Sequence, residues 1–323
     1  MTPRSVIKGA GYYLPEKILT NTELAKIVET SDEWILSRTG IEQRHIAADG
    51  EVTSDLATKA AQMALDNAGM SIDQIDQIIV ATTTPDRVFP ATACYVQEKL
   101  GAKGSAFDMQ AVCSGFIFGM GIADSLITSG QFETTLLIGA ETMSRILNWE
   151  DRNTCVLFGD GAGAVILQKE ECEGAITDTG VLANYMRSDG AHTQSLLVTG
   201  GPSYNQQSGF IDMNGKEVFR HAVNNISDAI ITLLDRTQLD VSDIDWFVPH
   251  QANSRIIKSV GQKIGLDEDK VIVTVNKHAN TSAASVPLAF AQYYLNGTIK
   301  KGDLVMLEAM GAGFSWGGNL IRV

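Results

Sequence analysis

The sequence has few cysteines and no apolar run long enough to cross a bilayer. Its four cysteines are scattered, without a C-x-x-C pair, at Cys94, Cys113, Cys155 and Cys172. This spacing excludes a disulfide framework and a cysteine-ligated zinc site. The opening MTPRSVIKGAGYYLP also lacks the continuous apolar run of a signal peptide. We therefore expect a soluble, cytoplasmic protein with reduced thiols and no association with membranes.

Basic residues are also scarce. The chain has 25 Lys and Arg against 38 Asp and Glu, a net charge of −13. This balance argues against nucleic-acid binding, which needs a basic face, but it leaves room for a local basic patch. Hydrophobic residues make up 44% of the 323 positions, enough for one large core or two fused ones.

The chain alternates strand-like apolar runs with helical stretches, a pattern that predicts a layered α/β fold. Expected strands cover 75–83, 104–111, 134–141, 163–169, 244–250 and 303–310. Expected helices cover 54–69, 114–130 and 252–265.

A shift of 169 residues superimposes part of the chain on itself. It places residues 75–76 on 244–245, residues 136–138 on 305–307, and Cys113 on Ser282. One offset that aligns three segments in order indicates duplication of an α/β unit, with halves at 1–172 and 173–323. Coincidence among repetitive α/β patterns is the alternative. Duplication predicts a site where equivalent loops of the two halves meet.

Cys113, in MQAVCSGFIFGMG, lies between a predicted strand and a predicted helix. The positive end of the helix dipole at this turn favours thiolate over thiol. A buried cysteine that acts as a small hydrophobic residue is the alternative. Cys94 and Cys155 lie in helical or apolar runs and are expected in the core.

Two polar residues of the second half are candidates to act with Cys113. His250 ends the strand IDWFVP at PHQAN, where a ring nitrogen is free to donate a hydrogen bond. Asn280, in NKHANTSAAS, could hold a developing oxyanion with its amide. Capping or turn roles are the alternatives for both. His278 is a weaker candidate, because alternate residues of an extended segment face opposite ways.

Two glycine-rich runs complete the pattern. Residues 311–314 (GAGF) follow a predicted strand, and their backbone N–H groups could form half of an oxyanion hole with the amide of Cys113. Residues 158–164 (FGDGAGA) lack the spacing of either phosphate-binding glycine motif. We expect this second run to form a tight turn between packed strands.

The chain resembles thiolase-fold condensing enzymes, and specifically the β-ketoacyl-[acyl carrier protein] synthase III family. Six segments in order along the whole chain carry the resemblance: TSDEWILSRTGIEQRHIA (30–47), AVCSGF (111–116), DRNTCVLFGDGAGAVIL (151–167), VPHQANSRII (248–257), HANTSAAS (278–285) and GAGFSWG (311–317). It implies a five-layered αβαβα homodimer that uses an acyl-CoA primer and malonyl-acyl carrier protein. It also implies that no metal or redox cofactor is needed.

The resemblance also assigns roles to residues. It implies a Cys113–His250–Asn280 triad, with backbone amides of Cys113 and Ala312 as the oxyanion hole. Trp34 and Arg152 would bracket the adenine of CoA and Arg38 would approach its phosphates, while Phe89 would reach into the partner's acyl pocket. Further substrate contacts would be Phe158, Met213 and Asn253. Docking of the carrier protein would use Arg220, Arg255, Lys258 and Lys263, although Gln262 departs from paired basic residues and puts the strength of docking in doubt.

These residues predict a decarboxylative Claisen condensation that starts type II fatty-acid synthesis, with acetyl-CoA as the expected primer. A thiolase is disfavoured, because no cysteine follows Cys172. Elongating synthases carry a second histidine where Asn280 stands. A related enzyme with a different acyl or aromatic primer, and a non-catalytic scaffold, are the remaining alternatives. The sequence does not fix the length or branching of the primer.

Overall fold

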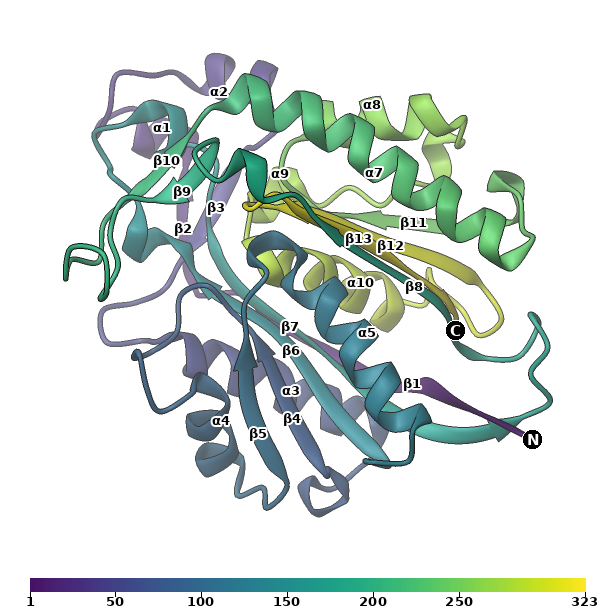
Figure 1. The fold of residues 1–323 in the computed structure, drawn as a ribbon. Coiled ribbons are helices and arrows are strands. Elements are labelled where there is room, and N and C mark those ends of the chain that lie inside the picture. Colours follow the sequence, from purple (N-terminus) through teal and green to yellow (C-terminus); the bar gives the residue numbers. More distant parts are fainter.

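Two sheets, each lying between helices, form five layers in the computed structural model, which describes residues 1–323 (Figure 1). The first sheet has the order β1-β7-β6-β4-β5, with bounds Thr2–Tyr13, Asp160–Cys172, Thr134–Thr142, Gln77–Ala81 and Ser105–Met109. The second has the order β11-β12-β13-β8, with bounds Trp246–Pro249, Leu304–Gly311, Ser315–Arg322 and Gly180–Ser188. The predicted strands are therefore confirmed.

The helices occupy the three remaining layers. Helices α3 (Thr53–Ala68) and α4 (Thr92–Leu100) cover the outer face of the first sheet, and α7 (Gly215–Thr237) and α8 (Ser254–Ile264) cover that of the second (Figure 1). Helices α5 (Gly115–Thr128) and α10 (Ser285–Leu295) lie between the sheets. Both central helices are rich in apolar residues, because sheets pack on two sides of them. The predicted αβαβα order is confirmed.

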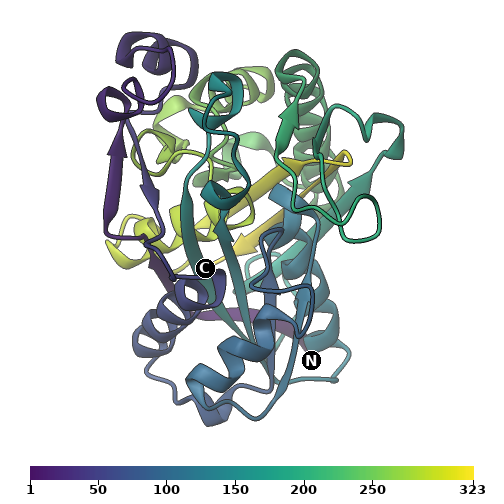
Figure 2. The same cartoon turned by 90° about the vertical axis from the view of Figure 1, so that its left-hand side faces the viewer.

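Short elements stand at the end of the sheets where the site lies. They are β2 (Lys17–Thr20), α1 (Asn21–Leu24), α2 (Asp32–Thr39), β3 (Gln43–Ile46), α6 (Arg152–Cys155), β9 (Leu196–Val198), β10 (Ile211–Met213) and α9 (Val275–His278). Figure 2 shows α1, α2 and the β2–β3 pair in purple on one side, and the β9–β10 pair in green on the other. No helix is both long and apolar enough to span a membrane.

The two halves repeat one another down to single hydrogen bonds. Asp76 precedes β4, and its Oδ2 accepts from Thr134 N, at the start of β6, at 3.0 Å. Asp245 precedes β11, and its Oδ2 accepts from Leu304 N, at the start of β12, at 2.8 Å. Each aspartate thus joins two parallel strands at the same point of its sheet. The repeat extends to the whole order of the sheets, since β4, β6 and β7 match β11, β12 and β13.

The offset between the halves is not constant, which corrects one pairing. It is 169 between β4 and β11, but 170 between the 3₁₀ turns at Val112–Ser114 and Ser282–Ala284. One additional residue in the second half therefore makes Ala283, rather than Ser282, the counterpart of Cys113. Strand β7 ends at Cys172, and the next strand belongs to the second sheet. The division into domains at that residue stays a prediction.

The FGDGAGA run is part of a strand, not the expected tight turn. Strand β7 begins at Asp160, and α10 lies directly against it. A Cβ at Gly163 would lie 2.3 Å from Leu288 N of that helix, a distance that no side chain tolerates. The glycines therefore permit close helix–sheet packing, a reason that local sequence does not reveal.

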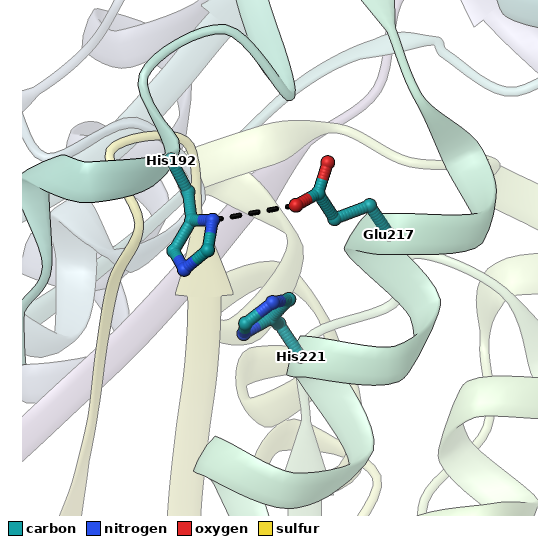
Figure 3. Close-up of side chains that lie close together, drawn as sticks. All are labelled: His192, Glu217 and His221. Atoms are coloured by element: carbon teal, nitrogen blue, oxygen red, sulfur yellow. Dashed lines mark ion pairs between the residues drawn. The ribbon is translucent and has the colours of Figure 1, made fainter.

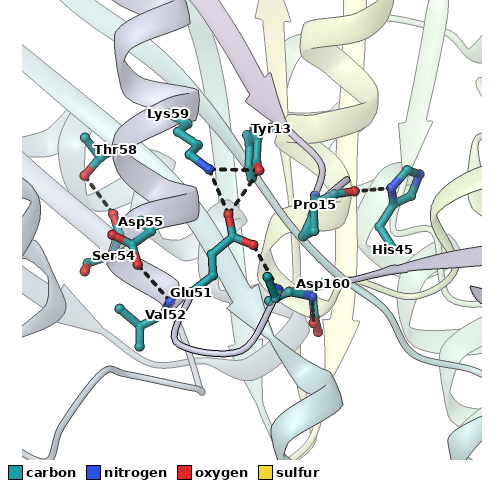
Figure 4. Close-up of polar contacts among 12 residues, drawn as sticks. Tyr13, Pro15, His45, Glu51, Val52, Ser54, Asp55, Thr58, Lys59 and Asp160 are labelled. Atoms are coloured by element: carbon teal, nitrogen blue, oxygen red, sulfur yellow. Dashed lines mark hydrogen bonds and ion pairs between the residues drawn. The ribbon is translucent and has the colours of Figure 1, made fainter. Parts of the chain in front are cut away.

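An exposed polar network fixes the start of α3 against β1 (Figure 4). Asp55 Oδ2 accepts from Val52 N at 2.9 Å, which satisfies a free N–H at the helix start. Lys59 Nζ donates to Glu51 Oε1 at 2.8 Å and to Tyr13 OH at 2.9 Å, and Glu51 raises the pKa of Lys59. Because Lys59 is about half exposed, the ion pair contributes roughly 0–1 kcal/mol.

Candidate active site

The candidate nucleophile lies on a strained turn between β5 and α5. Val112, in the turn that holds Cys113, has φ of 49°, which non-glycine residues seldom adopt. The end of β12 comes unusually close to this turn, since a Cβ at Gly311 would lie 2.7 Å from Cys113 N. Glycine at 311 is thus required for contact between the two halves. The Cys113 side chain is only 5% exposed.

Serine hydroxyls join the nucleophile turn to the GAGF loop. Ser114 Oγ donates to Ser315 O at 2.7 Å, and Ser315 Oγ lies 3.1 Å from Ala111 O. Ala312, in the loop, lines the same cavity as Cys113. These contacts place the backbone of Ala312 near the candidate nucleophile, as the oxyanion-hole prediction requires, although the role itself stays a prediction.

The resting thiol does not carry the charge that the helix dipole led us to expect. Burial raises the pKa of Cys113 from 9.0 to about 12, and the Glu141 carboxyl raises it further, while Ser282 lowers it. A change of that size corresponds to about 4 kcal/mol. A helix N-terminus supplies only about 0.3–1 kcal/mol, so desolvation outweighs the dipole. The residue is positioned as a nucleophile but rests as a neutral thiol.

We expect the alkylation rate of Cys113 by iodoacetamide to rise about tenfold per pH unit from pH 7 to 9.5. The thiolate is the reactive form, and a pKa of about 12 keeps its fraction rising throughout this range. Mass spectrometry of the Cys113 peptide measures the rate, and a small free thiol serves as the reference. A plateau below pH 9 would contradict burial as the dominant effect.

His250 lies at the end of β11 as a neutral ring with one nitrogen engaged. Its Nδ1 and Ser285 Oγ are 2.6 Å apart, and Ser285 lies at the start of α10. Donation by the hydroxyl to Nδ1 leaves the proton on Nε2, the tautomer that donates a hydrogen bond into the cavity. Burial lowers the pKa of His250 to about 4, so the ring is uncharged at neutral pH.

Asn280 is held so that its amide N–H₂ remains available. Its Oδ1 accepts from Ser282 N at 2.8 Å, and its backbone N donates to Leu157 O at 2.9 Å. With the carbonyl oxygen engaged, the Nδ2 protons are the part of the side chain free to bind a substrate oxygen. Cys113, His250 and Asn280 line one cavity, which brings the three predicted residues together.

His278 lies outside this arrangement, although not for the reason expected from the sequence. The segment is helical, not extended, and His278 ends α9. Its ring is buried, with Nε2 3.2 Å from Gln292 Nε2, and it lines neither cavity at Cys113. Burial, with His45 nearby, lowers its pKa to about 3, so it is a neutral core residue.

Two cavities meet at Cys113. The first also contains Met213, Asn253 and the α7 residues Gly215, Val218, Phe219, Ala222 and Ile226. The second lies on the other side of the sulfur and is lined mainly by Met143, Ile146, Leu197, Val198, Ile211 and Ala312. Only Cys113, Phe158 and Leu196 line both. Each cavity has a volume of about 150 Å³.

The sequence analysis missed Glu308 and Ser285, which both touch His250. Glu308 Oε1 lies 3.2 Å from His250 N, and burial raises the pKa of Glu308 to about 8. The carboxyl is therefore neutral at pH 7 and places no charge beside the imidazole. An acidic residue within the apolar run LVMLEAM was a signal that could have identified it. Ser285 had no comparable signal, because small residues surround it.

The residues predicted to hold CoA lie beside the first cavity. The guanidinium carbons of Arg38 and Arg152 lie 4.9 and 5.1 Å from the centre of the Trp34 ring. Asn253 Nδ2 donates to Arg38 O at 3.1 Å, which joins α8 to the end of α2. Arg152 stacks on the ring surface that an adenine would need, so binding of adenine between them requires the arginine to move. The structure brings these four residues together, and their roles stay predictions.

The residues predicted to dock a carrier protein lie on two adjacent helices. Arg220 lies on α7, and Arg255, Lys258 and Lys263 lie on α8; all four are exposed. Phe89, predicted to enter a partner subunit, is 82% exposed. The placement of all five residues at the surface is what partner contacts require, and the contacts themselves stay predictions.

The fold defines the class first: two matched α/β halves in five layers are the architecture of thiolase-fold condensing enzymes. A structure from Aquifex aeolicus, a 3-oxoacyl-[acyl-carrier-protein] synthase III, superposes with a TM-score of 0.93 at 43% identity, covering 99% of this chain and 100% of that one. One from Pseudomonas aeruginosa PAO1, with the same description, gives 0.92 at 40% identity over 99% and 98% of the two chains.

Sequence comparison reaches the same family. Models described as 3-oxoacyl-[acyl-carrier-protein (ACP)] synthase III and its C-terminal part match residues 107–190 and 234–323. A β-ketoacyl-[acyl-carrier-protein] synthase III of Bradyrhizobium diazoefficiens is 56% identical over 99% of this chain and 98% of its own. The chain belongs to the β-ketoacyl-[acyl-carrier-protein] synthase III family of condensing acyltransferases, and the predicted family is confirmed.

Proposed function

We propose that the protein condenses an acyl-CoA primer, acetyl-CoA in the first instance, with malonyl-acyl carrier protein. The product is 3-oxoacyl-acyl carrier protein, the first intermediate of type II fatty-acid synthesis. The observation that carries the proposal is the single cavity lined by a cysteine, a neutral histidine and an asparagine with a free amide. Family membership supports it.

The first half-reaction transfers the acyl group to Cys113. The sulfur attacks the thioester carbon, and the backbone amides of Cys113 and Ala312 stabilise the oxyanion. The C–S bond to CoA then breaks, and CoA leaves as a thiol. Because the resting Cys113 thiol is protonated, its proton must leave as the new bond forms, and the departing CoA thiolate is its acceptor.

The second half-reaction forms the carbon–carbon bond. Loss of CO₂ from the malonyl group leaves its electron pair as an enolate, with negative charge on the thioester oxygen. His250 Nε2–H and the Asn280 amide stabilise that oxygen without protonating the carbon, because both donors are neutral. The enolate carbon attacks acyl-Cys113, and the released sulfur takes up a proton. None of these steps requires a metal or redox cofactor.

We assign the outer helices to binding of the carriers. Arg220, Arg255, Lys258 and Lys263 form a local basic patch on a chain of net charge −13, suited to an acidic carrier protein. Trp34, Arg38 and Arg152 provide ring and cationic groups for the CoA nucleotide. The exposed Phe89 supports a homodimer, in which this side chain is buried by the partner. The proposed location is the cytoplasm.

Intact-mass measurement after exposure to a panel of acyl-CoAs tests the proposal. We expect one acyl group per chain, on Cys113, and release of CO₂ only when malonyl-acyl carrier protein is added afterwards. Cys94→Ala, a half-buried cysteine of α4, is the matched control and should retain both activities. Acylation without CO₂ release, or neither event with any acyl-CoA, would contradict the proposal.

A condensing enzyme for a different primer is the second candidate. The priming β-ketosynthase of the R1128 polyketide pathway superposes with a TM-score of 0.92 at 31% identity, covering 100% of this chain and 98% of that one. The same panel separates the candidates, because retention of a longer or aromatic acyl group in preference to acetyl supports the second.

A further inference from the structure

Three metal-binding side chains meet outside the candidate active site. His192 lies in a 3₁₀ turn (Gly190–His192), and Glu217 and His221 lie on α7 (Figure 3). One ligand atom from each lies within 4.8 Å of the others, and the two imidazole centres are 4.3 Å apart. None of the three lines either cavity at Cys113.

The helix places two of these groups on one face. Glu217 and His221 are four residues apart, a spacing that stacks their side chains over successive turns. His192 approaches from another segment, with Nδ1 3.3 Å from Glu217 Oε1 (Figure 3). All three residues are partly buried, so less side-chain freedom is lost when they are fixed.

We propose that His192, Glu217 and His221 bind a divalent transition metal of the Zn²⁺ class. Two imidazoles and one carboxylate are a ligand set that zinc accepts, with a fourth position left open to solvent. Nitrogen and oxygen ligands lie about 2.0–2.2 Å from zinc, so small side-chain rotations bring these three groups into range. The neutral imidazoles favour zinc over magnesium, which prefers oxygen ligands and retains its water.

Neighbouring groups already orient two of the ligands. Asp189 Oδ2 lies 3.7 Å from His192 Nε2, on the side of the ring away from Glu217, where a carboxylate supports a metal-bound histidine. Ser195 Oγ donates to Glu217 Oε2 at 2.7 Å, which leaves Oε1 free toward the imidazoles. Ion pairing alone does not require this second layer of polar contacts.

One group opposes a cation at this position. Arg220 NH2 lies 3.1 Å from His221 Nε2 and 4.0 Å from Glu217 Oε1. Its side chain is 68% exposed, so it can turn into solvent when a metal binds. Arginine at this place lowers the affinity and predicts that Arg220→Ala binds the metal at least as tightly as the unmodified protein.

The position of the cluster links it to the cavity roof. Both imidazoles stack against Phe314 of the GAGF loop, at 5.4 Å for His192 and 5.1 Å for His221. The chain between His192 and Glu217 includes β9 and β10, and Leu196 and Met213 of these strands line the first cavity. A bound metal would therefore join both ends of this segment and fix it over the site.

Titration of the full-length protein with ZnCl₂, MgCl₂ or CoCl₂ tests the inference, read by calorimetry and by melting temperature. We expect one zinc per chain and a higher melting temperature, with no response to magnesium. His192→Ala and His221→Ala should each weaken zinc binding about 100-fold or more. Lys216→Ala, next to Glu217 on the same helix, is the matched control and should bind zinc normally.

Two further readings make the result decisive. The cobalt spectrum should show nitrogen and oxygen ligation without a thiolate charge-transfer band, which excludes binding at a cysteine. The histidine variants without metal should melt with the unmodified protein, which separates lost ligation from misfolding. Zinc binding that is absent, or equally tight in both histidine variants, would overturn the inference. The proposed condensation is measured in the presence of EDTA, so that it stands or fails independently.

Discussion

Cys113→Ala is expected to reduce acylation by acyl-CoA to below about 0.1% of the unmodified rate, because no other group in either cavity can form the thioester. The substitution removes one sulfur from a buried turn and leaves the backbone amide in place. Malonyl decarboxylation should remain detectable, since His250 and Asn280 are unaffected.

Intact mass after incubation with acetyl-CoA measures this effect, and CO₂ release from malonyl-acyl carrier protein measures the retained step. Cys155→Ala removes a second fully buried cysteine, from α6, and controls for a general loss of stability. Acylation of Cys113→Ala at the unmodified rate would show that a different residue is the nucleophile.

His250→Ala and Asn280→Ala are expected to have the opposite effect. Each should still accept an acyl group, but decarboxylate malonyl-acyl carrier protein about 100- to 1,000-fold more slowly. Removal of one donor to a developing oxyanion costs about 2.7–4 kcal/mol in barrier height. The enolate oxygen would lose one of its two neutral hydrogen-bond donors in either variant.

Asn280→Asp is the sharper variant of the asparagine. It keeps the oxygen that accepts from Ser282 N at 2.8 Å, so the local turn is preserved, but it replaces the donating N–H₂ with oxygen. Separate assays of acyl transfer and CO₂ release distinguish the two half-reactions. Equal loss of both in the histidine and asparagine variants would show that these residues support acyl transfer or folding rather than the enolate.

Periodicity and turn residues were sufficient to predict the main strands and helices. The Ile-Asp pairs at 75–76 and 244–245 also identified a real repeat, because Asp76 and Asp245 make the same strand-joining hydrogen bond. The repeat could not be continued to Cys113 with a single offset, since a one-residue insertion leaves no mark on local patterning. The FGDGAGA run was misread because the helix that requires its glycines lies more than 120 residues further along the chain.

The three central site residues were recognisable from sequence, but their protonation states were not. Position at a helix N-terminus is a local property, and it pointed to a thiolate. Burial depends on how both halves pack, and it raises the pKa of Cys113 and Glu308 while it lowers that of His250. The contact between His192 and α7 is likewise a tertiary property that spacing does not reveal.

The meeting of the two cavities at a single sulfur constrains the order of events. Cys113, Phe158 and Leu196 are the only residues common to both cavities, so this is where a chain held in the second cavity adjoins the first. If the acyl chain occupies the second cavity, the first must be vacated by CoA before the malonyl arm can reach the sulfur. We therefore expect ping-pong kinetics, with parallel double-reciprocal plots and competitive inhibition of each substrate by excess of the other.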